Sequence, residues 1–226
     1  ISRLYSMNVP EQGVVQFPMH GAVKSDAYGW ANYPIGVVRV MEDAEHRAAH
    51  GFDIVLYGTL PNGAGLSSSA SIEVLMAVIL NDELNLGIDM VELVKFSQKA
   101  ENEFVGMNCG IMDQFAVGMG KKDCAILLDC NTLSYRYSKL SLDGCSIVIT
   151  NTNKTHSLVT SAYNERRAQC ESALKALQKV KPIKALGELT NAEFDAIASA
   201  IPDPVERRRA RHAVYENNRT LEAVKA

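Results

Sequence analysis

The sequence predicts a mixed α+β fold made of two domains, and three observations support this prediction. Short segments rich in β-branched and aromatic residues, typical of strands, alternate with longer segments whose apolar residues recur at helical spacing. Two helical segments, at 71–84 and 89–104, follow one another directly, which excludes a simple strand–helix–strand repeat. A turn at Asp143 precedes a further strand segment, so we place the domains at 1–143 and 144–226.

The first domain contains strand and helix patterns in alternating order. These are strand 14–17, helix 30–50, strand 52–57, helices 71–84 and 89–104, and strands 125–128 and 135–140. Asp89, with Glu92 three residues later, marks the start of the second adjacent helix as a capping pattern does. His46 and His50 lie four residues apart on the helix predicted over 30–50. Because no third ligand lies nearby, we interpret them as part of a surface helix face.

The second domain is predicted to be one strand followed by helices. Residues 145–150 have strand composition, and residues 157–180 carry helical spacing. Thr190, with Glu193 three residues later, is expected to cap a short helix, and Asp203 begins the last one.

Composition limits the function classes. The chain has 226 residues, 47% hydrophobic and 22% charged, which is enough to bury a core without disulfides or a structural metal. A net charge of −3 gives no reason to expect a nucleic-acid or membrane partner, and no apolar run is long enough to span a bilayer. Five cysteines without a Cys-x-x-Cys pair indicate neither a disulfide framework nor a zinc site. We therefore expect a cytoplasmic protein, and a monomer.

The segment 61–70 is the strongest chemical signal in the sequence. Gly63 and Gly65 permit a close backbone approach to a ligand, and Ser67, Ser68 and Ser69 supply hydroxyl groups. The loop leads directly into a helix N-terminus, where free N–H groups and the helix dipole favour an anion. A phosphate group is the natural ligand for such a loop.

Other classes of phosphate loop fit less well. A Walker loop needs a lysine before the Ser or Thr at the start of the helix, and none occurs between Gly63 and Ala70. A dinucleotide-binding fingerprint needs Gly or Ala where Ser68 stands, and a strand after the first helix. A simple turn whose serines cap a helix remains a minority alternative.

The segment is similar to the second motif of the GHMP small-molecule kinases, a Pro-x-x-x-Gly-Leu-Ser-Ser-Ser-Ala loop. The matching residues are Pro61, Gly65, Leu66, Ser67, Ser68, Ser69 and Ala70. The resemblance implies a GHMP kinase architecture, with a ribosomal-protein-S5-domain-2-like α/β domain followed by a partial ferredoxin-like domain. It also implies ATP as cofactor, bound through its phosphates by Gly63, Ala64, Gly65, Leu66, Ser67, Ser68 and Ser69.

Two carboxylates are candidates for the chemistry. Glu101 near a helix end could hold Mg²⁺ with Ser69, although from residue type alone a solvated carboxylate is the better interpretation. Asp113 stands in an apolar stretch and could accept a proton from a substrate hydroxyl, or could equally cap the helix that begins there.

The stretch 109–115 resembles the galactokinase segment Gly-Ile-Met-Asp-Gln-Phe, preceded by Cys109. This resemblance implies that Asp113 is the catalytic base, that Ser69 and Glu101 are magnesium ligands, and that Asp113 and Gly110 contact galactose. The stretch 161–167 resembles one whose tyrosine contacts galactose, which makes Tyr163 a candidate, with helix packing as the alternative. The resemblance of residues 30–33 places Trp30 near the adenine pocket.

The family's first sugar-binding motif and its third, glycine-rich motif have no match in this sequence. We therefore expect a fragment that alone shows weak or no catalysis. The implied activity is transfer of the ATP γ-phosphate to the anomeric hydroxyl of galactose. Two alternatives remain: another GHMP sugar kinase, or a catalytically silent sensor of ATP and sugar. A dinucleotide-binding oxidoreductase is disfavoured by the helix-after-helix order.

Overall fold

The computed structural model describes residues 1–151 and 159–225, and the chain forms two compact units, Ile1–His156 and Ser157–Ala226. Each unit has its own buried core and is described separately. The predicted family-domain boundary at residue 143 stays a prediction.

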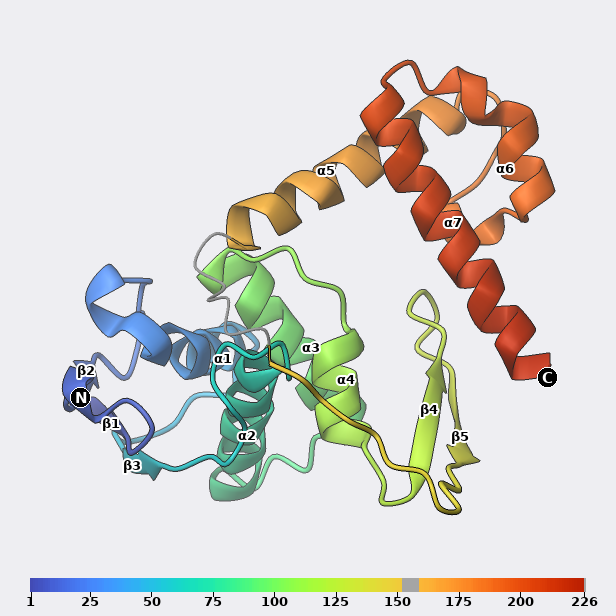
Figure 1. Cartoon of the computed structure of the whole chain (residues 1–226). Coiled ribbons are helices and arrows are strands. Elements are labelled where there is room, and N and C mark those ends of the chain that lie inside the picture. The colour runs from blue at the N-terminus through green and yellow to red at the C-terminus, as the bar shows by residue number, and fades with distance from the viewer. Residues whose placement is uncertain (152–158, 226) are drawn as a thin grey trace. The chain divides into compact units, whose positions relative to one another are not determined.

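A three-stranded sheet lies at one side of the first unit (Figure 1). Strands β1 (Ser2–Ser6), β2 (Val15–Phe17) and β3 (Asp53–Leu56) are ordered β2-β1-β3, with β1 antiparallel to β2 and parallel to β3. The predicted strands at 14–17 and 52–57 are thus confirmed, whereas β1 was missed. Two of its three buried residues are Ser2 and Ser6, so it lacks the apolar alternation that identifies a strand.

Four helices of the first unit lie beside this sheet: α1 (Asn32–Asp43), α2 (Ser68–Glu83), α3 (Met90–Lys99) and α4 (Met112–Met119). They follow one another across the unit away from the sheet in Figure 1. Their main core is formed by fully buried apolar side chains, among them Leu4, Ile35, Met41, Met76 and Leu93. The predicted succession of two helices is confirmed, and α2 begins three residues earlier than predicted, at Ser68.

The first helix ends earlier than predicted. We expected it to continue to residue 50, but α1 ends at Asp43. Glu45 adopts a left-handed conformation with φ 66°, and the N–H of His46 donates to the carbonyl of Met41 at 2.9 Å. This is a Schellman-type helix end with Glu where glycine is usual, which is why the sequence did not signal it. The interpretation of His46 and His50 as neighbours on one helix face is therefore wrong.

A β-hairpin completes the described part of the first unit. Strands β4 (Cys124–Leu128) and β5 (Tyr135–Lys139) pair antiparallel, as the patterns predicted. The hairpin packs on α4 through a Phe115–Tyr135 ring contact with centroids 5.2 Å apart, and the Tyr137 hydroxyl donates to the Met119 carbonyl at 2.6 Å.

The strand predicted at 145–150 does not form, and this prediction is wrong. Ile147, Val148 and Ile149 are exposed by 68%, 83% and 66%. Within the described residues no strand pairs with them. Strand composition becomes a strand only where a neighbouring strand completes its hydrogen bonds, and here none is available.

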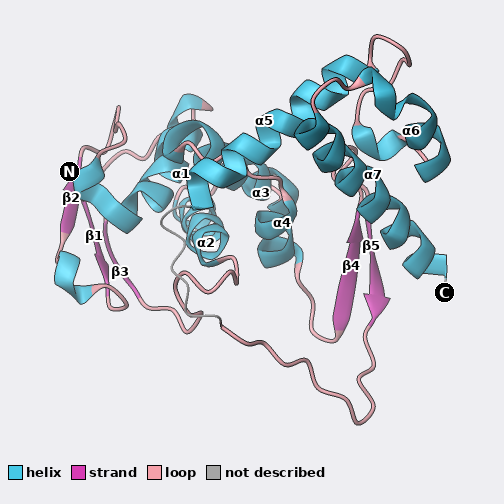
Figure 2. Cartoon of the chain, turned by 45° about the horizontal axis from the view of Figure 1, so that its top comes forward, coloured by secondary structure: helices cyan, strands magenta, loops and turns pink. Residues whose placement is uncertain are grey.

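The described residues of the second unit contain helices and loops (Figure 2). Helices α5 (Val159–Leu177), α6 (Asn191–Ile197) and α7 (Pro204–Lys225) surround a core that includes Leu177, Phe194 and Val214. The predicted helix 157–180 is thus found over α5, although its first two residues lie outside the described residues.

The predicted helix starts of the second unit are confirmed. Thr190 and Glu193 form a complete capping box on α6, and the Asp203 carboxylate accepts from the N–H groups of Val205 and Glu206 at 2.7 and 3.0 Å. No helix in the described ranges is both long and apolar enough to cross a membrane.

Candidate functional site

The loop before α2 has an unusual backbone. Gly63 and Gly65 have φ of 68° and 73°, and Ser67 has φ 58° and ψ 37°, in the left-handed region that side chains disfavour. A non-glycine residue held there costs of the order of 1 kcal/mol, and such strain concentrates at functional sites. The two glycines are therefore needed for the turn, as predicted, and Ser67 is bent with them.

The N-terminus of α2 is free for a ligand. Among the described residues, no side chain caps it, and its first turn contains no acidic residue. Ser68 and Ser69 are the first two residues of the helix. Because the first N–H groups of a helix have no partner within the helix, this end offers donors and the positive end of the dipole to an anion.

Close to this helix start, three buried polar side chains meet in the interior of the unit. Glu73 on α2 is fully buried, Glu101 is 3% exposed, and Gln114 on α4 is fully buried. The Gln114 Nε2 group donates to Glu73 Oε2 at 3.0 Å and to Glu101 Oε2 at 2.6 Å. One amide thus joins two carboxyl groups that come from different elements.

A short π-helical turn, Ala100–Val105, positions Glu101. The Glu101 carbonyl accepts from the N–H groups of both Gly106 and Met107, at 2.9 and 3.0 Å, which closes the widened turn. Such turns occur often at functional sites. The Cys109 Sγ lies 3.5 Å from Glu101 Oε2, so the loop after the turn folds back onto the same carboxyl group.

The electrostatics of the pair favour one shared negative charge. Burial, reinforced by the negative charge of Glu101, raises the pKa of Glu73 to about 10. Burial also raises the pKa of Glu101, but hydrogen bonds from Cys109, Ser69, Glu73 and Gln114 oppose this shift. At neutral pH the proton therefore resides on Glu73, and Glu101 is the anion. Burial raises the pKa of Cys109 to about 12, which keeps it a thiol.

The Ser69 hydroxyl is hydrogen-bonded to the Glu101 carboxylate, so the two predicted magnesium ligands come together. A hydroxyl and a carboxylate are oxygen donors of the kind that Mg²⁺ takes while retaining several waters. In the described part of the chain, no group of three or more His, Cys, Asp and Glu residues is arranged to hold a metal. The pair therefore fits a hydrated Mg²⁺ ion shared with phosphate oxygens, and does not form a closed all-protein site.

Asp113 lies in the first turn of α4, next to Gln114. Its side chain is half-buried and, within the described residues, it does not cap the helix, because α4 begins at Ile111 without a side-chain cap. The alternative of a helix-capping aspartate thus finds no support. Gly110 is exposed just before it, with open space where a side chain would stand.

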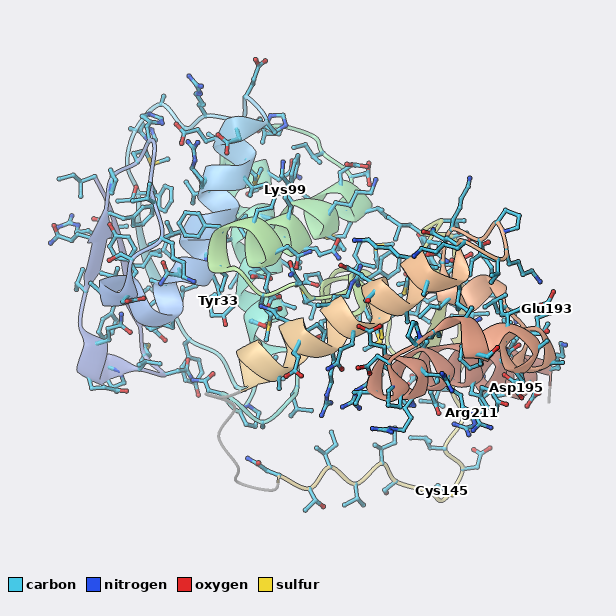
Figure 3. All side chains as sticks on the ribbon, turned by 90° about the horizontal axis from the view of Figure 1, so that it is seen from above. Tyr33, Lys99, Cys145, Glu193, Asp195 and Arg211 are labelled. Atoms are coloured by element: carbon cyan, nitrogen blue, oxygen red, sulfur yellow. The ribbon has the colours of Figure 1, made fainter. Side chains whose placement is uncertain are left out.

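Three aromatic residues have different positions. Tyr33, at the start of α1, is half-buried, and its pKa is raised first by burial and then by the negative charge of Glu101 (Figure 3). Trp30 is half-buried, and its ring N–H is buried without a partner among the described residues. Tyr163 lies on α5 of the second unit, 40% exposed, and its role in sugar binding stays a prediction.

Sequence analysis missed Glu73 and Gln114 as site residues. Glu73 falls inside an apolar helix pattern, at a position where a charged residue would be costly, and this conflict was a usable signal. Gln114 directly follows Asp113, but no pattern indicates that it reaches Glu101. That contact depends on how α4 packs against α2 and the π turn.

Comparison with known proteins agrees with this geometry. Residues 32–121 match the family model of the GHMP kinases N-terminal domain, which contains the loop, Glu101 and Asp113. This part of the chain is therefore a GHMP kinase N-terminal domain.

Within that class, the chain is a homologue of galactokinases over nearly its whole length. It is 58% identical to the Clostridium beijerinckii galactokinase over 221 residues, which is 98% of this chain and 57% of that protein. It is 60% identical to the Clostridium acetobutylicum galactokinase over 220 residues, or 97% of this chain and 57% of that protein.

A solved structure, the Lactococcus lactis galactokinase complexed with galactose, matches with a TM-score of 0.91 and 44% identity. The match covers 100% of this chain and 58% of that one. This chain thus spans less than three fifths of the length of these relatives, and the α+β GHMP kinase fold predicted from the sequence is confirmed.

Proposed function

We propose that the protein containing this chain is a galactokinase, which transfers the γ-phosphate of ATP to the anomeric hydroxyl of galactose. The observation that carries the proposal is the uncapped N-terminus of α2 with Ser69 hydrogen-bonded to the buried anion Glu101. The 50–60% identity to galactokinases supports the choice of reaction and sugar.

The α2 N-terminus and its loop act on the phosphates. The N–H groups from Gly63 to Ser69 are the donors that we assign to the phosphate oxygens. Ser69 and Glu101 would hold Mg²⁺, which offsets charge on the β- and γ-phosphates when bound. Burial of Glu101 keeps this single negative charge at a defined place.

Asp113 is the base in this proposal. The galactose hydroxyl oxygen forms a bond to the γ-phosphorus, the bond between the γ-phosphorus and the ADP oxygen breaks, and the hydroxyl proton goes to the Asp113 carboxylate. Support comes from its position in the first turn of α4, where it is half-buried and not engaged in capping. Gly110 leaves room beside it, and Tyr163 is proposed as a further galactose contact.

The remaining proposals concern cellular setting. The five cysteines, all within the described residues, are free, which supports a reducing compartment such as the cytoplasm. We also propose that the protein works as a monomer.

The test is galactose-dependent ADP release by the complete gene product, with Asp113→Asn in parallel. We expect turnover with galactose, and a loss of about 10²–10⁴-fold in the variant, the usual contribution of a general base. Because Asp113 does not cap α4, the thermal midpoint should not fall. Turnover only with a different sugar would favour another GHMP sugar kinase. Binding of MgATP and galactose without ADP release would favour a sensor.

A further inference from the structure

The amide of Gln114 is used in an unusual way. Its side chain is fully buried, and Nε2 donates to two carboxyl groups, Glu73 at 3.0 Å and Glu101 at 2.6 Å. Its Oε1 atom is buried and has no hydrogen-bond partner among the described residues. The side chain thus serves as a donor at two points and leaves its acceptor unsatisfied.

This arrangement is costly for a core position. A buried polar atom without a partner destabilises the fold, and a leucine of similar volume would avoid that cost in an apolar core. A leucine would also leave two buried carboxyl oxygens without their donor. The physical reason for an amide at position 114 is therefore its two donated hydrogen bonds, which fix the carboxyl groups.

The bonds to Glu101 are confined to one of its two oxygens. Both Gln114 Nε2, at 2.6 Å, and Cys109 Sγ, at 3.5 Å, meet the Oε2 atom. Glu73 adds a hydrogen bond to the same carboxyl group from α2. A carboxylate held in this way from three elements has its plane fixed, because rotation would break these contacts.

We propose that Gln114 and Glu73 are positioning residues that hold Glu101 by its Oε2 atom, so that its Oε1 atom is directed to the cation of a bound metal nucleotide. This inference rests on the proposed function for the identity of the ligand. It also gives the galactokinase-like segment 109–115 a second role, since Asp113 and Gln114 are adjacent in it. One turn of α4 then supplies both the base and the residue that orients the metal ligand.

The test measures metal binding without turnover. Mn²⁺ replaces Mg²⁺ as an EPR-visible probe, and the complete gene product is titrated with Mn²⁺ in the presence of the non-hydrolysable ATP analogue AMP-PNP. A second titration measures AMP-PNP affinity in EDTA, without metal. The variants are Gln114→Leu, Gln114→Glu and the exchange Glu73→Gln with Gln114→Glu, which returns one amide and two acids to the cluster.

Gln178→Leu is the matched control. Gln178 is another partly buried glutamine whose Nε2 makes one hydrogen bond, to the Ile183 carbonyl at 2.9 Å, in the second unit. Its loss removes an amide hydrogen bond without touching Glu101, so we expect Mn²⁺ affinity to stay at the wild-type value.

We expect Gln114→Leu and Gln114→Glu to weaken Mn²⁺ binding about 10–100-fold, as loss of a residue supporting a metal ligand usually does. The AMP-PNP affinity in EDTA should stay unchanged, and the exchange variant should recover part of the Mn²⁺ affinity. Wild-type Mn²⁺ affinity in Gln114→Leu would overturn the inference. So would an equal loss with and without metal, since this would indicate a structural role only.

The inference and the proposed function can fail separately. If the wild-type protein binds Mn²⁺ with AMP-PNP but phosphorylates no sugar, the galactokinase proposal fails, and the Mn²⁺ titrations of the variants still decide the role of Gln114. If ADP release with galactose is found but Gln114→Leu binds Mn²⁺ normally, the galactokinase proposal stands and the positioning role is rejected.

Discussion

The helix starts of this protein fall into two kinds. Helices α3, α6 and α7 begin with a side chain that accepts hydrogen bonds from their first N–H groups: Asp89, Thr190 and Asp203. Helices α2 and α4, which carry the candidate phosphate loop and the candidate base, begin without such a cap among the described residues.

The difference separates stability from function. A capping side chain stabilises a helix start by about 1 kcal/mol, and the chain uses this freely where no ligand is expected. At α2 the corresponding N–H groups remain free and Ser67 is held in a left-handed conformation, so two sources of local stability are forgone. The proposed phosphate is the partner that would satisfy these groups.

The largest effect should come from giving α2 an acidic start. Ser67→Asp places a negative charge at the helix end where we assign the phosphates, and near the Glu101 anion. We expect MgATP affinity to fall about tenfold or more, a difference of about 1.4 kcal/mol, measured by calorimetric titration. Ser67→Asn is the neutral control, because asparagine also tolerates the left-handed conformation. An equal loss in both variants would show that shape, and not charge, limits binding.

A smaller effect is expected where caps exist. Asp89→Ala and Thr190→Ala each remove the acceptor of a helix start, and should each lower the free energy of unfolding by about 1 kcal/mol in urea titrations. Nucleotide affinity should not change in either variant. Weaker MgATP binding in Thr190→Ala would contradict the separation between the two kinds of helix start.

The smallest effect concerns Glu193, the second member of the capping box. The Lys181 ammonium 2.6 Å away, and then the Thr190 groups, lower its pKa to about 2. A carboxylate with a depressed folded-state pKa stabilises the fold above its unfolded pKa, about 4.3, and this contribution is lost as the pH falls towards 2.

Glu193→Gln should therefore lower the urea midpoint at pH 7 by less than Thr190→Ala does. Between pH 4 and pH 2 the difference from wild type should shrink towards zero. A difference that stays constant down to pH 2.5 would mean that the hydrogen bonds of Glu193, and not its charge, carry its contribution.

Local patterns were most informative where a few neighbouring residues decide the structure. The caps at Asp89, Thr190 and Asp203 and the glycine and serine loop were all predicted correctly, because each depends on contacts within a few positions. Predictions were wrong where a distant partner or an unmarked turn decides. Helix α1 ends at a left-handed glutamate, and residues 145–150 have no strand beside them.

The sequence by itself determined the α+β class, the phosphate loop, and the identity of Ser69, Glu101 and Asp113 as candidates. Only the tertiary structure decided that Ser69 and Glu101 meet, and that Gln114 joins Glu101 to the buried Glu73. The physical reason is burial. A carboxyl group's charge and hydrogen bonds depend on what surrounds it, and those neighbours come from helices that are distant in sequence and adjacent only after folding.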